Sequence, residues 1–152
     1  MQECARAVLL TPAGEILLMK IRGWERELWT TPGGRIRTGE DPIAALRREL
    51  LEETGREEFA IEGPIWVRQG SFVTKERRVE ERETFYLVRT ERFEPSTDGF
   101  EPEEASIHLG FRWWTLEELE ASTDFMVPAR LPFHLRGLFH SGLPAAPIDV
   151  SG

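Results

Sequence analysis

The sequence predicts an α/β domain built around a mixed β-sheet. Short apolar segments of strand length alternate with segments of helical periodicity, and this order favours that fold class. A chain of 152 residues is long enough to bury a hydrophobic core within one domain. Its composition, 40% apolar and 30% charged, is that of a globular protein rather than a disordered one. We predict one domain over residues 1–142 and an extended tail over residues 143–152.

The N-terminal segment predicts two strands joined by a turn. Its apolar runs cover residues 7–10 and 16–21, and the intervening "TPAG" supplies Pro12 and Gly14, which favour turns. Residues 23–41 are rich in glycine and proline, so we predict a loop there with room for one short strand.

The clearest element is a helix over residues 42–54. Asp41 suits the N-cap, Pro42 suits the first helical position, and Gly55 suits the left-handed residue that closes a helix. Helix 42–54 is therefore predicted with both of its ends defined.

The C-terminal half predicts further strands around an acidic loop. "IEGPIWVRQGSF" and "RETFYLVRTERF" are predicted strands, and the second alternates apolar residues on both faces. "EPSTDGFEPEEAS" contains two prolines and a glycine and is predicted as a loop. "GFRWWTL" is predicted as the last strand of the sheet.

Two helices are expected after that strand. Thr115, with Glu118 three residues later, is typical of a capping box at the start of a short helix. The second helix has apolar residues at helical spacing, namely Leu131, Leu135, Leu138 and Phe139.

The charge and cysteine content exclude several functions. Nineteen basic and 27 acidic residues give a net charge of −8, which argues against binding a nucleic-acid duplex through a general basic surface. Cys4 is the only cysteine, so an internal disulfide is impossible and a reducing compartment is expected. No apolar run approaches the length of a membrane span, and no cleavable leader is apparent. We therefore expect a cytoplasmic protein without a membrane partner.

Three glutamates crowd the end of helix 42–54, where the helix dipole favours cations instead. At 100° per residue Glu49, Glu52 and Glu53 share one side of the helix, with the small Ala45 one turn earlier. A separate stripe faces the core and consists of Ile43, Leu46 and Leu50.

A solvated acidic face and a metal site both explain this pattern. Arg48 can pair with Glu52, and Glu52 with Arg56, but such exposed pairs contribute only about 0.3–0.5 kcal/mol each. Glu49 and Glu53 lie four residues apart and repel each other by roughly as much. A divalent cation would reverse the sign of that repulsion, and Mg²⁺ prefers carboxylate and phosphate oxygens.

From Gly34 to Arg56 the chain resembles the signature box of the Nudix hydrolases. Every gap of that motif matches across eight fixed positions, which are Gly34, Glu40, Arg48, Glu49, Leu50, Glu52, Glu53 and Gly55. Arg56 stands where the family usually has an aliphatic residue, which affects the packing after the helix but not the carboxylates.

The resemblance implies an α/β/α sandwich that cleaves a nucleoside diphosphate linked to another group. It implies Mg²⁺, or in some members Mn²⁺, held by Glu49 and Glu53, with Glu52 assisting and the Gly33 carbonyl as a further ligand. Arg48 is expected to hold Glu49, and Glu40 to brace the preceding loop. A small nucleotide derivative is the implied partner, and homodimers are common in the family.

The general base is less sharply indicated. In the family it is a box glutamate or one from a loop before the last strand, which here offers Glu104, Glu103 and Glu101, with His108 behind them. We favour Glu104 and keep Glu83 as an alternative, because Glu83 shares a predicted strand face with apolar residues.

Substrate recognition lies outside the motif. Arginine grips phosphate well, and the available arginines are Arg22, Arg37, Arg77, Arg78 and Arg82, each of which also suits an ordinary surface. Trp24, in "RGWEREL", is the tryptophan most suited to stacking on a nucleobase, whereas most of the others are expected in the core. Arg22, Trp24 and Arg82 are our predicted substrate-binding residues.

Two rival functions remain at this point. A nucleotide-sensing or protein-interaction module on the same scaffold would bind without hydrolysis, although such modules usually lose carboxylates of the motif and none is lost here. A coincidental acidic helix in an unrelated protein would bind no divalent metal.

Overall fold

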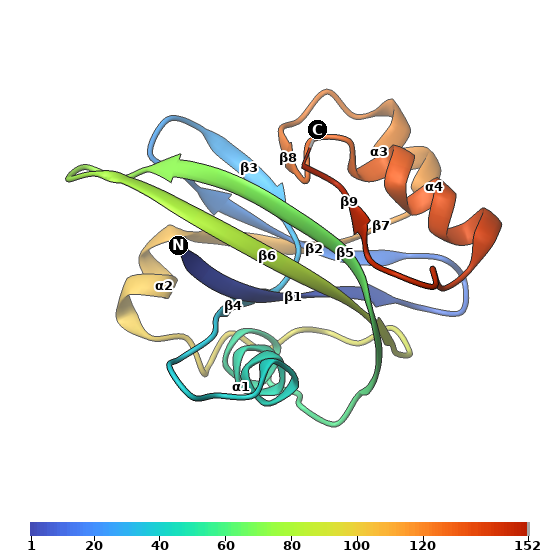
Figure 1. Cartoon of the computed structure of the whole chain (residues 1–152), viewed down its shortest axis with the longest axis horizontal. Coiled ribbons are helices and arrows are strands. Elements are labelled where there is room, and N and C mark those ends of the chain that lie inside the picture. Colours follow the sequence, from blue (N-terminus) through green and yellow to red (C-terminus); the bar gives the residue numbers. More distant parts are fainter. Residues whose placement is uncertain (152) are drawn as a thin grey trace.

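A computed structural model describes residues 1–151 and contains nine strands and four helices (Figure 1). In chain order they are β1 Gln2–Leu10, β2 Ile16–Arg22, β3 Glu27–Thr30, β4 Gly33–Arg35, α1 Pro42–Thr54, β5 Ala60–Val73, β6 Arg78–Arg89, α2 Pro102–Ile107, β7 His108–Trp114, α3 Leu116–Ala121, β8 Met126–Val127, α4 Leu131–Ser141 and β9 Ile148–Asp149. Among these residues no helix is both long and apolar enough to cross a membrane.

The strands form one mixed sheet with β1 near its centre. The order is β8-β3-β2-β1-β6-β5-β9, with β4 added beside β1 and β7 beside β2. Strand β1 runs parallel to β6 and antiparallel to β2 and β4, while β5 and β6 form a long antiparallel hairpin. The predicted pair of N-terminal strands and the mixed character of the sheet are confirmed.

Helices cover the sheet on two sides, each over its own apolar cluster. In Figure 1 helix α1 lies below the strands, and helices α3 and α4 lie together on the upper right. Alternate residues of β1 serve the two clusters: Ala7 and Leu9 pack with Leu46 and Leu50 of α1, whereas Val8 belongs to the cluster of α3 and α4. The predicted α/β/α sandwich is confirmed.

Helix α1 has the bounds and caps that its sequence predicts. The Asp41 carboxylate accepts hydrogen bonds from the backbone N–H groups of Ile43 and Ala44, and Gly55 closes the helix with a φ of 84°. The predicted capping box of Thr115 and Glu118 is also present at the start of α3.

The acidic segment 94–106 differs from its prediction as a loop, because it contains the start of helix α2. Pro102 takes the first position, and Glu103 and Glu104 lie in the first turn, where their charges complement the helix dipole. The prolines that suggested a loop are thus compatible with a short helix. Residues 23–41 likewise contain two short strands, β3 and β4, where we expected one.

Two predictions near the C-terminus are refined. On α4 Leu131, Leu135 and Leu138 are buried as expected, but Phe139 is 43% exposed because it lies at the edge of the apolar stripe. In the tail, β9 pairs in parallel with β5, and Val150 is buried in the cluster of α3 and α4.

Candidate metal centre

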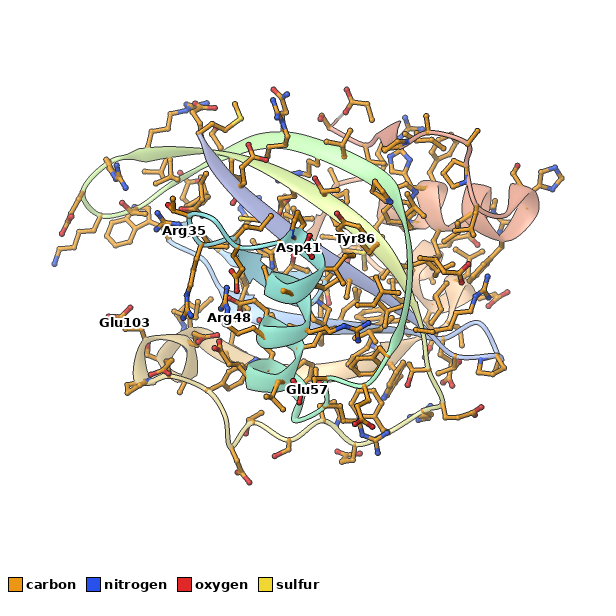
Figure 2. All side chains as sticks on the ribbon, turned by 60° about the horizontal axis from the view of Figure 1, so that its bottom comes forward. Arg35, Asp41, Arg48, Glu57, Tyr86 and Glu103 are labelled. Atoms are coloured by element: carbon orange, nitrogen blue, oxygen red, sulfur yellow. The ribbon has the colours of Figure 1, made fainter. Side chains whose placement is uncertain are left out.

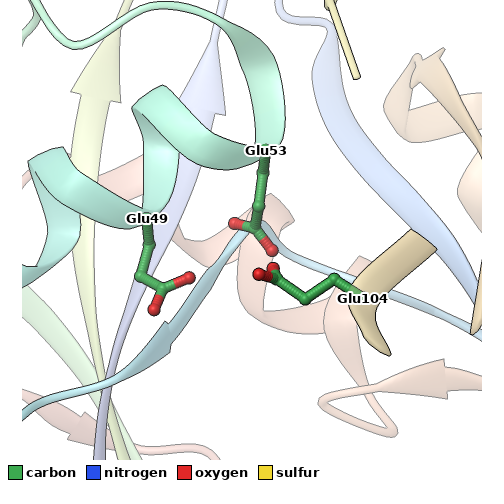
Figure 3. A group of neighbouring side chains, drawn as sticks. All are labelled: Glu49, Glu53 and Glu104. Carbon is green, nitrogen blue, oxygen red and sulfur yellow. The ribbon is translucent and has the colours of Figure 1, made fainter. Parts of the chain in front are cut away.

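Three glutamates from two helices converge in space. Glu49 and Glu53 extend from α1, Glu104 extends from α2, and one carboxylate oxygen of each lies within 4.8 Å of the others (Figure 3). Helical spacing of four residues places the first two on the same side of α1. Three oxygen donors at this spacing are able to hold a divalent metal ion.

Glu53 lies deepest in this group, with 4% of its surface exposed. Its Oε1 accepts a hydrogen bond of 2.7 Å from the backbone N–H of Gly33. Burial raises the pKa of Glu53 well above its usual range, and Glu49 and Glu104 add to the rise while Arg6 opposes it. Gly33 has a φ of 141°, and a Cβ there would lie 2.2 Å from the Ala5 carbonyl oxygen. Only glycine therefore allows this close approach of the loop.

Glu49 is held in place by Arg48. The Arg48 Nη1 donates to Glu49 at 2.8 Å, and Nε and Nη2 donate to the Glu40 carboxylate at 2.9 and 2.8 Å. Its Nη2 also donates to the Arg35 carbonyl of β4 at 3.0 Å, and Figure 2 shows Arg35 and Arg48 on the same side of α1. Burial raises the pKa of Glu49, although Arg48 opposes the rise. The expected contact of Arg48 with Glu49 is present.

Glu40 braces the loop before α1, as the resemblance implied. Its Oε1 accepts a hydrogen bond from the Arg37 backbone N–H at 3.0 Å, in addition to its bonds with Arg48. These bonds lower the pKa of Glu40 to about 2, with Arg48 as the largest cause. Glu40 is therefore an anion throughout the neutral pH range.

The acidic segment contributes Glu104 to the cluster and leaves its neighbour Glu103 exposed to solvent. Glu104 is partly buried, while Glu101 and Glu103 are exposed, and Figure 2 shows Glu103 projecting outward from α2. Burial raises the pKa of Glu104, and Glu49 and Glu52 add to the rise. His108 instead lies between two aromatic rings, those of Phe100 and Phe111.

Of the two ion pairs that the sequence suggested for Glu52, the described residues contain the one with Arg48 and not the one with Arg56. Glu52 is outside the group of converging carboxylates and lies 3.7 Å from Arg48, the expected pair. Arg56, expected to pair with Glu52, places its guanidinium over the Phe93 ring at 4.4 Å. This cation–π contact occupies the position where the family motif has an aliphatic side chain.

A second group of buried charges lies beside the first, and of its members the sequence reasoning had singled out only Glu83. Glu83 is 1% exposed, and its two oxygens each accept a 2.7 Å hydrogen bond, one from Arg6 and one from Arg68. We call these three residues the Arg6–Glu83–Arg68 cluster. Both oxygens of Glu83 are engaged by arginines, so its charge is compensated within the protein. The signal in the sequence was an arginine inside the apolar run "CARAVLL".

The predicted substrate-binding residues are exposed on the surface. Arg22 ends β2, Trp24 follows it and is 63% exposed, and Arg82 on β6 lies 3.7 Å from Glu3. Within residues 1–151 no hydrogen bond or ion pair joins them to the converging glutamates. The tryptophans expected in the core are buried, namely Trp29, Trp66, Trp113 and Trp114.

The sequence model of the NUDIX domain matches residues 2–135, which is most of the chain. This protein belongs to the NUDIX family. The fold agrees with that of other NUDIX proteins: the crystal structure of a MutT NUDIX hydrolase from Burkholderia pseudomallei superposes with a TM-score of 0.62 at 23% identity, covering 88% of this chain and 96% of that one.

Curated relatives match over shorter stretches. An oxidized purine nucleoside triphosphate hydrolase of Danio rerio is 49% identical over 49 residues, 32% of this chain and 31% of the relative. An RNA pyrophosphohydrolase of Rhizobium meliloti (strain 1021) is 32% identical over 110 residues, 63% of this chain and 64% of the relative. The match thus spans less than two thirds of each of these relatives.

Proposed function

We propose that this NUDIX protein hydrolyses the diphosphate linkage of a nucleoside diphosphate joined to another group, with Mg²⁺ or Mn²⁺ as cofactor. The observation that carries the proposal is the convergence of Glu49, Glu53 and Glu104 within 4.8 Å. A nucleotide-type substrate follows from the family. One relative is named as a hydrolase of oxidized purine nucleoside triphosphates, and the other as an RNA pyrophosphohydrolase.

The donor set fits a hard divalent cation. Three carboxylates supply only oxygen, the donor that Mg²⁺ and Mn²⁺ prefer, and their mutual repulsion falls when a cation lies among them. Glu49 and Glu53 are proposed as the principal ligands, with the Gly33 carbonyl as a further ligand and Glu52 acting through water. When bound, such a cation lowers the pKa of a water molecule and neutralises charge on the diphosphate.

The residues of the chain would divide the remaining work. Arg48 would keep the Glu49 carboxylate turned into the site, because its guanidinium is fixed between that carboxylate and Glu40. The Gly33 N–H would keep Glu53 in place through its 2.7 Å hydrogen bond. Both contacts are present in this structure, which supports a preorganised role for the two carboxylates.

Glu104 is proposed as the general base that takes a proton from the attacking water. It comes from α2 rather than from α1, and its oxygen faces those of Glu49 and Glu53. A water molecule between the two helices would therefore lie within reach of Glu104. Glu101 and Glu103 are exposed and do not belong to this group.

For the substrate we propose that Arg22 and Arg82 contact phosphate and that Trp24 stacks on the base. The exposure of Trp24 supports a stacking role, because an exposed indole offers a free face to a nucleobase. Oligomeric state stays a prediction, and light scattering coupled to size exclusion would test the homodimer.

The test is a substrate panel assayed with Mg²⁺ and with Mn²⁺. It should contain nucleoside triphosphates, oxidised purine nucleotides, nucleotide sugars, dinucleoside polyphosphates and 5′-triphosphorylated RNA. Wild-type protein is compared with Glu53→Gln, and with Glu103→Gln as the matched control on the exposed side of α2. Turnover lost only in Glu53→Gln is the expected result. Tight binding without turnover in the wild type would support the nucleotide-sensing module instead.

A further inference from the structure

Arg6 is a charged residue on a central strand of the sheet. Its neighbours in the chain, Ala5 and Ala7, are fully buried, and its own side chain is only 16% exposed. In the antiparallel pairing of β1 with β4, Arg6 is the register partner of Gly33. A buried guanidinium is costly unless several of its donors are satisfied, so its partners indicate what it does.

The Arg6 guanidinium connects the Arg6–Glu83–Arg68 cluster to the backbone of the candidate metal centre. Its Nε donates to Glu83 at 2.7 Å, and its Nη1 donates to the carbonyl oxygens of Thr31 and Gly33, both at 3.2 Å. Glu83 is fixed from its other side by Arg68 at 2.7 Å. The guanidinium is thus anchored at one end and grips two backbone carbonyls at the other.

The residue that Arg6 grips is the one that touches Glu53. The Gly33 carbonyl accepts from Arg6, and the Gly33 N–H donates to Glu53 Oε1 at 2.7 Å. The N–H belongs to the Pro32–Gly33 peptide, whose own carbonyl accepts from the Ala7 N–H at 2.8 Å. The two carbonyls that Arg6 contacts belong to the peptides on either side of it, so Arg6 holds the backbone that flanks this N–H. The contact matters because Gly33 has a φ of 141°, a conformation outside the ordinary strand region.

We propose that Arg6 is a positioning residue of the metal centre: through the Thr31 and Gly33 carbonyls it holds the peptides on both sides of the Gly33 N–H, and thereby orients the Glu53 carboxylate. The proposal rests on the proposed function in taking Glu53 and Gly33 as metal-binding groups. It adds a residue that lies outside the signature motif, 27 positions before the glycine it orients.

The geometry requires an arginine rather than any cation. The planar guanidinium presents Nε to Glu83 while Nη1 reaches the two carbonyls. A lysine at this position keeps the charge but has a single nitrogen on a flexible stem, so it cannot reproduce this divided contact. Arg6→Lys therefore separates orientation from charge.

The first measurement is the amide of Gly33 itself, in protein labelled with ¹⁵N-glycine and without metal. In Arg6→Lys we expect the Gly33 resonance to shift and its amide hydrogen to exchange at least about tenfold faster, because the contact to Glu53 opens more often. The Gly55 amide, which donates to the Leu51 carbonyl at 3.0 Å at the end of α1, should keep its shift and exchange rate.

The second measurement is the dissociation constant of Mn²⁺, taken by titration in electron paramagnetic resonance. Arg6→Lys should raise it about tenfold, the scale on which outer partners of metal ligands act. The matched control is Arg136→Lys, because Arg136 on α4 makes a similar two-nitrogen contact with exposed Glu120. The control should leave both measurements unchanged.

Three outcomes decide the matter. A folded Arg6→Lys with wild-type Gly33 exchange and wild-type Mn²⁺ affinity would overturn the role of Arg6. If Arg6→Lys does not fold, Glu83→Gln loosens the anchor of Arg6, and the Gly33 amide should then exchange faster relative to the Gly55 amide, whereas an equal change at both amides would overturn the proposal. Absence of Mn²⁺ binding in the wild type would refute the proposed function alone, since Gly33 exchange still decides the orienting role.

Discussion

Glu53 and Glu83 are buried almost equally, with 4% and 1% of their surfaces exposed, yet their surroundings shift their pKa values in opposite directions. Burial raises the pKa of both carboxyls in principle. At Glu83, Arg6 and Arg68 more than offset burial, so the pKa of Glu83 lies below its usual value. At Glu53 the hydrogen-bond donor is a neutral backbone N–H, and the pKa rises well above its usual value.

The difference separates two uses of a buried anion. Arg6 and Arg68 compensate the charge of Glu83, so this compensation does not depend on a bound ion. Glu53 accepts from a neutral backbone N–H, and Glu49 shares its arginine, Arg48, with Glu40. Together with Glu104 these carboxylates are less fully compensated than Glu83, so they are expected to meet a cation from outside. The comparison predicts that the two groups respond in opposite ways to the same chemical change, from carboxylate to amide.

Glu53→Gln should show the largest effect. We expect hydrolysis to fall at least about 10³-fold, more than the 10- to 100-fold that loss of an outer partner of a metal costs. The metal-free variant should meanwhile gain about 1 kcal/mol of stability, or about 3 °C in Tm, because an uncompensated charge is removed. Steady-state assays measure the loss of hydrolysis, and thermal melts at pH 7 measure the gain in stability. A variant that loses both activity and stability would place Glu53 in the same class as Glu83.

Glu104→Gln should lower kcat by about 10²-fold or more, the contribution typical of a general base. Its Mn²⁺ dissociation constant should rise by no more than about tenfold, the lower end of the effect of an outer partner, because Glu49 and Glu53 remain to hold the ion. Glu103→Gln is the control on the same helix. A large loss of Mn²⁺ affinity in Glu104→Gln would make Glu104 a metal ligand rather than the base.

Glu83→Gln should lower the free energy of unfolding by about 3 kcal/mol at pH 7, because it leaves buried arginines without their anion. The folded-state pKa of Glu83 is lowered, so its contribution is fully present above the usual value of 4.5 and is lost as pH falls through the folded pKa. The difference in free energy of unfolding between wild type and Glu83→Gln should therefore narrow below about pH 4.5. Urea unfolding at pH 7 and at lower pH measures it, and a gap that widens in acid would contradict the assignment.

Glu81→Gln should give the smallest effect, under about 1 kcal/mol in stability. Glu81 is an intermediate case, because Arg68 lies 3.6 Å away and yet burial, together with Glu83, raises the pKa of Glu81. Its charge is only partly compensated, so removing that charge costs little. A loss as large as that of Glu83→Gln in the same urea titration would move Glu81 into the compensated group.

Local patterns predicted those parts of the site that lie within one element. Asp41, Pro42 and Gly55 set the ends of α1, and the spacing of Glu49, Glu52 and Glu53 set the side of the helix that they share. The i, i+4 spacing pairs Glu52 with Arg48 and leaves Glu49 and Glu53 repelling each other, and the family resemblance takes these two as principal ligands. The structure includes Glu53 and Glu49 in the cluster and leaves Glu52 beside Arg48, because α2 approaches the first two from across the site.

The sequence by itself determined the helix, its caps, the family motif and the anionic character of the site, since each depends on residues a few positions apart. Only the tertiary structure decided that Glu104 joins the cluster and that Arg6 meets Glu83, 77 residues away. That meeting requires the parallel pairing of β1 with β6, and periodicity along a strand carries no information about which strand will lie beside it.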